Sequence, residues 1–134
     1  MELLTVIAII GILAGIVLGV AGYATGKSDR SKAIAQMEKI KNGLEEYRVN
    51  RGTYPPGIPL ATSSNQLTNA QFFQNFTNGL PRGYDTSEIS QVDPWGNGYW
   101  YQREASSAYQ YKLWSTGQNR LDDSDNINNW TGQE

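Results

Sequence analysis

The 134-residue sequence predicts an α+β fold, with one long N-terminal helix whose second half packs against a small antiparallel β-sheet. Three observations lead to this prediction. The chain begins with an apolar segment, a stretch with one apolar stripe at helical spacing follows, and strand-like alternation occurs only in the last third. We therefore divide the chain into an apolar helical segment at 1–26, an amphipathic continuation of the same helix at 27–50 and a globular head at 51–134.

The apolar segment is long enough to cross a membrane. Residues 3–26 carry no charge, and as a helix they would span about 36 Å, against about 30 Å for the hydrocarbon core of a bilayer. A secretory signal peptide fits poorly, because no basic stretch precedes the segment and its apolar run exceeds the usual length of about 7–15 residues. An ordinary single-pass anchor is the simplest alternative.

Two features of this segment go beyond a simple anchor. The first is Glu2, a carboxylate at the N-terminal end of an apolar helix. If the helix lies deep enough to place Glu2 in the hydrocarbon core, the buried charge is costly and requires a cationic partner. The alternative is that Glu2 lies among the lipid headgroups, where it is favoured only by the N-terminal end of the helix dipole. Gly11, Gly15 and Gly19 recur at every fourth residue and so share one side of a helix, where another helix can approach closely. Chance spacing in a segment rich in small residues is the alternative for the glycines.

The following stretch predicts an amphipathic continuation of the helix. Its apolar residues recur at spacings of four and three, which places them in a single stripe. Gly52 and the turn residues at 54–57 predict that the helix ends near residue 50. An apolar stripe is stable only when other residues cover it, and the head is the part of the chain that can do so. Its members are Ala33, Met37, Ile40, Leu44 and Tyr47.

A short helix and a β-hairpin are predicted within the head. The helix is expected at 69–76, with Thr68 as its N-cap and Phe72, Phe73 and Phe76 on its buried side. After a dense turn signal at 93–98, alternation predicts strands at 99–102 and 108–114, joined by a turn at 104–107. All four tryptophans belong to the head. Seven of the eight tyrosines also lie beyond residue 46. A sheet rich in aromatic residues could bind sugars or peptides, but in so small a domain we expect aromatic residues mainly in the core.

Oxygen ligands gather in the segment 117–129. Calcium binds about six to eight oxygens from carboxylates, amides and carbonyls, and without a cation closely spaced carboxylates repel one another. The EF-hand pattern fails, because its central glycine and closing glutamate are missing. From the residues alone, a solvated acidic loop and a calcium site are equally consistent. The candidate ligands are Asn119, Asp122, Asp123, Asp125 and Asn126.

The composition excludes several classes of function. Without cysteine or histidine the chain can build no disulfide framework, no zinc site of thiolates and imidazoles, and no Ser–His or Cys–His nucleophile. Its 11 basic and 13 acidic residues argue against a nucleic-acid binder with a large basic surface. Because its carboxylates show no recognisable catalytic pairing, we do not expect an enzyme.

Several of these segments together resemble one family. The sequence ELLTVIAIIGILA at 2–14 is similar to the N-terminal segment of type IV pilins and type II secretion pseudopilins, and EEYRVNRGTYP at 45–55 resembles the end of their long helix and the following loop. DPWGN at 93–97 resembles a motif of the major pseudopilin, and 115–127 resembles that protein's C-terminal calcium loop. Only residues around 58–90 remain unmatched.

The resemblance implies a structural protein that works by assembly. Family members carry a short basic leader, are cut by a prepilin peptidase and N-methylated, and wait in the bacterial inner membrane as single-pass monomers. They then form a helical filament in the periplasm or at the cell surface, with N-terminal helices at its centre. The implied partners are copies of the same chain, an inner-membrane assembly platform, the peptidase and minor pilins or pseudopilins. Nucleic acid is not expected unless the filament takes up DNA.

The resemblance also implies roles for single residues. Glu2 aligns with the family's glutamate, whose carboxylate is thought to pair with the terminal amine of a neighbouring subunit, and the row Gly11, Gly15 and Gly19 suits close packing in a filament core. Three departures matter. Only Met1 precedes Glu2, so we assign the terminal amine to no residue. The apolar helix contains no proline, so its glycines would have to allow local melting. Asn119 and Arg120 replace the Asp and Gly of the family's calcium loop, which weakens a calcium site.

Alternatives remain within and outside this class. The DPWGN motif and the lack of a C-terminal cysteine pair favour the major pseudopilin over a type IV pilin for adhesion, motility or DNA uptake. A membrane-anchored module that binds calcium or carbohydrate is the alternative from a different class. In such a module, Glu2 and the row of glycines would have no role in assembly.

Overall fold

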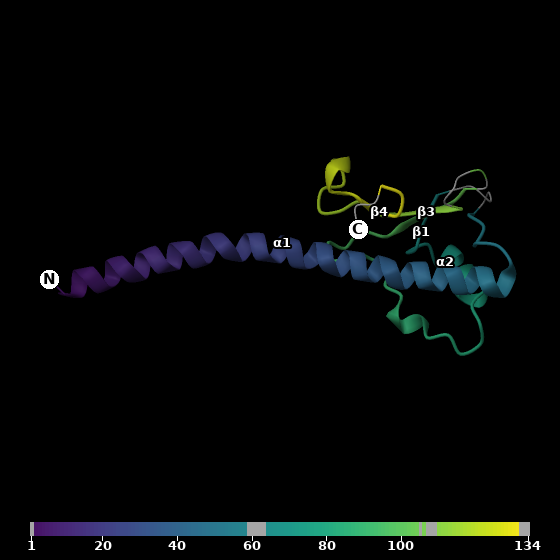
Figure 1. Cartoon of the computed structure of the whole chain (residues 1–134), viewed down its shortest axis with the longest axis horizontal. Helices are drawn as coiled ribbons and strands as arrows, with labels where there is room; N and C mark the ends of the chain where they lie inside the picture. The colour runs from purple at the N-terminus through teal and green to yellow at the C-terminus, as the bar shows by residue number, and fades with distance from the viewer. Residues whose placement is uncertain (1, 59–63, 105, 107–109, 132–134) are drawn as a thin grey trace.

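The computed structural model describes the whole chain except residues 1, 59–63, 105, 107–109 and 132–134, and it describes side chains except at these residues, at 2 and at 19–25. The molecule is a rod with a head at one end (Figure 1). The rod is helix α1 (Glu2–Arg51), which extends for 50 residues and carries the head along its second half. The predicted architecture of a long helix and a small antiparallel sheet is therefore confirmed.

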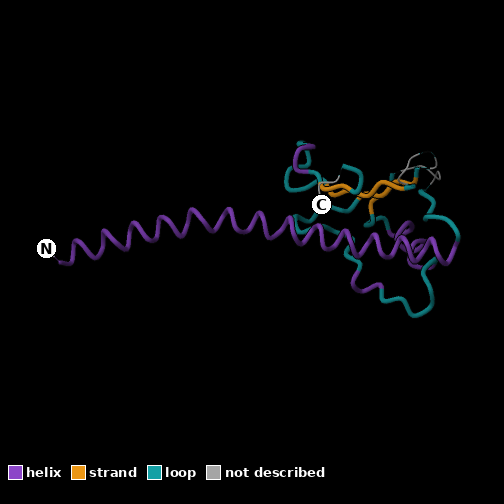
Figure 2. The backbone as a smooth tube through the Cα atoms, in the orientation of Figure 1, coloured by secondary structure: helices purple, strands orange, loops and turns teal. Residues whose placement is uncertain are grey.

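Helix α1 runs without interruption from the apolar segment into the head, as the backbone trace shows (Figure 2). It contains no proline that would break it. It ends at Gly52, which has a φ of 77° and donates its N–H to the Arg48 carbonyl at 2.7 Å. Glycine adopts this left-handed conformation without the steric cost of a side chain, so it terminates the helix where the sequence predicts.

The sheet has four antiparallel strands in chain order. Strands β2 (Trp100–Arg103) and β3 (Tyr111–Ser115) form the predicted hairpin, although part of its turn and of the strand predicted at 108–114 lies outside the described residues. Strands β1 (Asn65–Gln66) and β4 (Ile127–Asn128) flank the hairpin and were not predicted. Each has only two residues, too few for a recognisable alternation of apolar and polar positions.

The predicted short helix is α2 (Ala70–Asn78), but its N-cap was assigned wrongly. Asn69, not Thr68, caps the helix, because its side-chain oxygen accepts a hydrogen bond from the Phe72 N–H at 3.1 Å. Phe72 and Phe76 are buried as expected, whereas Phe73 is only partly buried. Two short 3-10 helices, η1 (Thr86–Glu88) and η2 (Asp123–Asp125), complete the head.

The core lies between the stripe of α1 and the inner face of the sheet. Four members of the stripe are buried and Tyr47 is partly buried. The hydroxyl of Tyr99, just before β2, donates to the Gln36 side chain at 2.8 Å, and the Tyr101 hydroxyl in β2 donates to the Pro55 carbonyl at 2.8 Å. Burial raises the pKa of both tyrosines, so they remain protonated hydrogen-bond donors at neutral pH. The Tyr99 bond ties this edge of the head to helix α1, and the Tyr101 bond ties β2 to the loop that follows the helix.

The expectation that aromatic residues fill the core is right for the tyrosines of the sheet and wrong for its tryptophans. Tyr101 and Tyr111 are buried, but Trp100 and Trp114 occupy the alternate positions of the same strands and are only partly buried. Successive side chains of a strand point to opposite faces, so the tryptophans lie on the outer face of the sheet.

Candidate functional site

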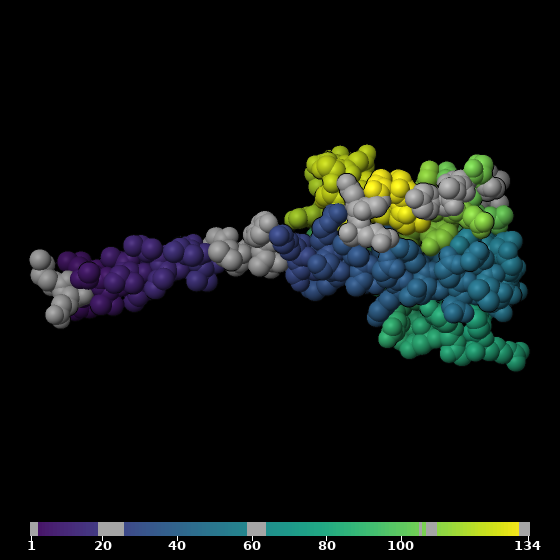
Figure 3. Space-filling model, viewed as in Figure 1, coloured from purple at the N-terminus to yellow at the C-terminus, as the bar shows by residue number. Residues whose placement is uncertain are grey.

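The first half of α1 presents a bare apolar surface. Every residue from 3 to 18 is exposed, including 11 large apolar side chains, from Leu3 at 80% to Leu18 at 77% exposure. Figure 3 shows this part of the rod clear of the head. Soluble monomers rarely expose contiguous apolar patches of more than a few hundred Å². The surface is therefore suited to being covered by lipid or by other protein chains.

The predicted assembly residues lie along this rod. A methyl group added at Gly11 or Gly15 would meet no atom of the chain within 4 Å, so the groove above these glycines is open to another helix. Glu2 is the first residue of α1, but its side chain and the surroundings of Gly19 lie outside the described part. Within the part of the chain that the structure describes with side chains, no helix is long and apolar enough to span a membrane. The membrane-spanning role of 1–26 thus stays a prediction.

A second site is centred on a buried carboxylate in the DPWGN turn. Asp93 is 3% exposed. Its Oδ1 atom accepts hydrogen bonds from the Trp95 N–H at 3.1 Å and the Asn97 N–H at 2.8 Å, and its Oδ2 atom accepts one from the Ser115 hydroxyl at 2.6 Å. A buried carboxylate needs such partners, because burial removes its hydration. Asp93 therefore fastens the turn to the end of β3.

The same network reaches the acidic loop. The Asn97 side-chain amide donates to the Gly117 carbonyl at 2.8 Å, and Arg120 donates its Nε–H to the Asn97 side-chain oxygen. Gly117 has a φ of 65°, and a methyl group there would lie 2.7 Å from the Asp125 carbonyl oxygen. Only glycine fits this position. The sequence gave Arg120 as a replacement that weakens a calcium site, and the structure shows that its side chain ties the loop to the turn.

The carboxylates of the loop make separate local hydrogen bonds. Asp122 accepts from the Ser124 N–H at 2.9 Å, a bond that lowers the pKa of this exposed carboxyl group. Asp123 accepts from the Asn126 side-chain amide at 2.9 Å. Within the described part of the chain, no three acidic side chains are grouped so that they could hold a metal ion. The structure therefore keeps the candidate ligands in one loop without bringing all of them together.

One feature of the loop does fit a cation. Asp125 accepts a hydrogen bond from the Asn119 N–H through Oδ2 at 2.8 Å, but its Oδ1 atom is buried without a hydrogen-bond partner. The Asp125 carbonyl lies 3.4 Å from the Arg30 guanidinium of α1, which joins the loop to the long helix. An unpartnered carboxylate oxygen is costly unless a cation or water binds it. Asp125 is thus the residue of the loop best suited to bind an ion.

The sequence did not predict which residues join the DPWGN turn to the acidic loop. It treated DPWGN as a turn signal and a family motif, and gave no role to Asp93, Asn97, Ser115 or Gly117. The available signal was an aspartate at the first position of a turn, whose side chain commonly accepts hydrogen bonds from the following N–H groups. The contacts with Ser115 and Gly117 join residues about 20 positions apart, for which the sequence gave no signal.

Comparison with known proteins agrees with this arrangement. The family described as "Type II secretion system (T2SS), protein G" matches residues 21–130. The chain is 26% identical to type II secretion system core protein G of Klebsiella pneumoniae over 132 residues, which cover 98% of this chain and 91% of that protein. Over 104 residues it is 31% identical to the protein of the same name from Vibrio cholerae, covering 75% of this chain and 66% of that one.

A solved structure is also similar to the chain. The crystal structure of the major pseudopilin from the type 2 secretion system of enterohaemorrhagic Escherichia coli has a TM-score of 0.46 and 23% sequence identity, covering 81% of this chain and 91% of that one. The family match spans most of the chain and includes the DPWGN turn and the acidic loop. The chain belongs to the protein G family of the type II secretion system, a family of pilin-like pseudopilins.

Proposed function

We propose that this chain polymerises into a pseudopilus through the first half of α1, as the major pseudopilin of a type II secretion system. The observation that carries the proposal is the bare apolar surface from residue 3 to 18, which its own head leaves uncovered. Membership of the protein G family supports assembly with other components of that system. The same match favours a pseudopilin over a type IV pilin. The work proposed is mechanical, with no catalytic step.

Before assembly, the proposed location of α1 is the inner membrane, with the head outside the cytoplasm. Transfer from lipid to a bundle of helices gains little hydrophobic free energy, since lipid tails are as apolar as leucine side chains. Close contact between helix backbones and specific polar pairs must therefore supply the gain. We assign the first role to the row Gly11, Gly15 and Gly19, and the second to Glu2 with the terminal amine of a neighbouring subunit. The proposed partners are the assembly platform, the prepilin peptidase and minor pseudopilins.

Substitution of Gly15 tests the packing surface directly. A Gly15→Leu chain is expected to keep its fold, because a side chain at this position meets nothing within 4 Å in the monomer, but to form few or no filaments. The measurement is electron microscopy of filaments sheared from cells that carry the complete secretion system. Ala14→Leu adds a similar side chain beside the glycine row and serves as the control. Filaments as abundant from Gly15→Leu as from Ala14→Leu would count against packing along this row.

We also propose that the acidic loop binds calcium with Asp125 as its anchor. The unpartnered Oδ1 atom of Asp125 supports this. Other oxygens would come from the remaining candidate ligands of the loop. Bound calcium would supply a positive charge that neutralises the loop and holds it closed. The proposed ligands are Asn119, Asp122, Asp123, Asp125 and Asn126.

Removal of calcium should then lower the stability of the head. At a calcium concentration of about 100 times the dissociation constant, binding stabilises the folded state by about 2.7 kcal/mol, which corresponds to about 10–20 °C in melting temperature for a domain of the size of the head. The measurement is thermal unfolding of the full chain in detergent, with calcium or with a chelator. The Asp125→Asn chain should show no such difference. A wild-type melting curve that calcium leaves unchanged would instead support a solvated loop.

A further inference from the structure

The face of the sheet turned away from α1 carries an aromatic row with amides at both ends. The strand pairing aligns Gln66 with Trp100, Trp100 with Trp114, and Trp114 with Asn128. The rings of Trp100 and Trp114 stack with their centres 5.9 Å apart and their planes at 9°. Trp130 adds a third indole, 5.9 Å from Trp114 and nearly perpendicular to it. We call these five residues the tryptophan face.

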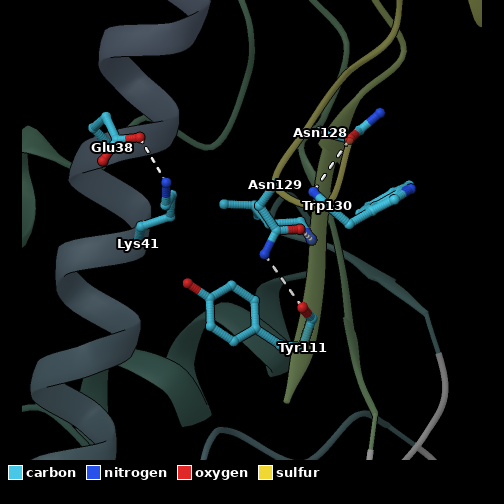
Figure 4. Close-up of polar contacts among 7 residues, drawn as sticks. Glu38, Lys41, Tyr111, Asn128, Asn129 and Trp130 are labelled. Carbon is cyan, nitrogen blue, oxygen red and sulfur yellow. Dashed lines mark hydrogen bonds and ion pairs between the residues drawn. The ribbon is translucent and has the colours of Figure 1, made fainter. Parts of the chain in front are cut away.

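A close-up shows which way this face points (Figure 4). Tyr111 extends from β3 toward α1, whereas Asn128 and Trp130 lie on the opposite side of the strand. Asn129 holds this end in place, since its side chain accepts from the Leu113 N–H at 2.9 Å and donates to the Tyr111 carbonyl at 3.2 Å. The tryptophan face is therefore built on paired strands and is fixed before any ligand arrives.

An open hollow lies at each end of the face. One, of about 420 Å³, is lined by Trp114, Trp130, Asn128, Lys112, Asp123 and Asn126. The other, of about 380 Å³, is lined by Trp100 together with the amide and hydroxyl side chains of Ser64, Asn65, Gln66, Thr68 and Asn69, and by Ile58. Each hollow thus combines an indole with side chains that can both donate and accept hydrogen bonds.

We propose that the tryptophan face binds a linear, uncharged oligosaccharide. A sugar ring presents apolar C–H groups on its faces and hydroxyl groups around its edge. The indole face carries negative quadrupole charge that attracts such C–H groups, and amide side chains match hydroxyls because they donate and accept. Ligand sites in proteins commonly combine aromatic surfaces with a few polar groups in this way.

The charge of the face favours a neutral ligand. Its five residues are all uncharged. The neighbouring Lys112 forms an ion pair with Glu104 at 2.9 Å and lies 5.7 Å from the centre of the Trp130 ring. The hollow beside Trp130 contains one basic and one acidic side chain, Lys112 and Asp123, so it presents no excess charge of either sign. A neutral glycan matches this balance.

The dimensions favour a chain over a single sugar. Neighbouring strands lie about 4.8 Å apart, so the row from Gln66 to Asn128 extends for about 14 Å across the sheet. That is the length of a few sugar rings in line. Stacked tryptophans also stabilise the sheet itself, and the Asn128 side-chain oxygen already accepts hydrogen bonds from the Trp130 N–H, the Thr131 N–H and the Thr131 hydroxyl. The stacking surface for a ligand is therefore the row of indoles, with the Gln66 amide at its other end.

The test measures binding of neutral tetrasaccharides to the full chain in a detergent without a sugar headgroup. The probes are cellotetraose, chitotetraose and maltotetraose, with saturation-transfer NMR and tryptophan fluorescence as readouts. At least one probe is expected to bind saturably, with transfer strongest at its ring C–H groups. Trp100→Ala and Trp130→Ala should each weaken binding about tenfold or more. Trp95→Phe, which changes the tryptophan of the DPWGN turn, should leave binding unchanged.

A further variant separates binding from folding. Gln66→Ala keeps all tryptophans and should still weaken binding several-fold, while thermal unfolding shows whether each variant keeps its head. Absence of saturation transfer from all three sugars at millimolar concentration would overturn the proposal. So would equal binding by Trp100→Ala and Trp95→Phe, or self-association of the chain through this face without sugar binding.

Discussion

A Glu2→Gln chain is expected to accumulate in the membrane at the normal level and to form no filaments. The substitution keeps the size of the side chain and removes its charge. In an apolar filament core, the terminal amine of the neighbouring subunit would then have no counterion, and breaking a buried ion pair in this way costs about 3–5 kcal/mol. That loss recurs at every added subunit. The measurement is electron microscopy of sheared material, with immunoblots of membrane fractions to confirm that the subunit is present.

The control for this experiment is a glutamate on the head. Glu88 forms an ion pair with Lys39 at 3.2 Å in which both side chains are well exposed. Exposed pairs contribute about 0–1 kcal/mol, so Glu88→Gln should assemble normally. Abundant normal filaments from Glu2→Gln would contradict the proposed ion pair between Glu2 and the terminal amine of a neighbouring subunit. Loss of the protein from the membrane in that variant would show that Glu2 acts in insertion or stability instead.

An Asp93→Ala chain is expected to have a head destabilised by about 3 kcal/mol or more. The substitution leaves the Trp95 and Asn97 N–H groups and the Ser115 hydroxyl without their acceptor, and each buried unsatisfied group costs about 1–3 kcal/mol. A small domain has a total stability of about 5–15 kcal/mol, so this is a large fraction. Chemical unfolding of the full chain in detergent, followed by circular dichroism, measures the effect.

Asp85 provides a matched control for this second prediction. It also accepts hydrogen bonds from a following N–H group and a hydroxyl, both of Ser87, but it is exposed at the start of η1. Water can replace its bonds, so Asp85→Ala should have a much smaller effect. Ser115→Ala should fall between the two, because it removes one partner of Asp93. Equal effects of Asp93→Ala and Asp85→Ala would contradict a structural role for the buried network.

Much of the fold could be predicted from the sequence because it depends on local patterns. The spacing of the apolar stripe predicted the amphipathic half of α1, and Gly52 predicted its end. The cap of α2 was misplaced by one residue because Thr68 and Asn69 are both good capping residues. The strands β1 and β4 were missed because two residues carry no pattern, and they form only where the hairpin offers its edges.

The candidate sites differ in how far the sequence predicts them. The apolar surface of α1 could be predicted because it is a property of consecutive residues. The network around Asp93 could not, since it depends on contacts between the DPWGN turn and the loop after β3. The sequence raised an aromatic sheet that binds sugars or peptides as the alternative to an aromatic core, but it could not locate the tryptophan face, for a related reason. Its row exists only in the register of four strands, and the sequence gives no register between β1 and β2 or between β3 and β4.

The most direct measurement is a cryo-electron microscopy reconstruction of filaments assembled from the full-length chain. We expect residues 3–18 of α1 at the filament axis, with Gly11 and Gly15 facing neighbouring helices and Glu2 within ion-pair distance of a terminal amine. The heads should form the outer layer and keep the fold described above. Filaments held together by the heads alone, with the apolar half of α1 in lipid or detergent, would contradict assembly through this surface.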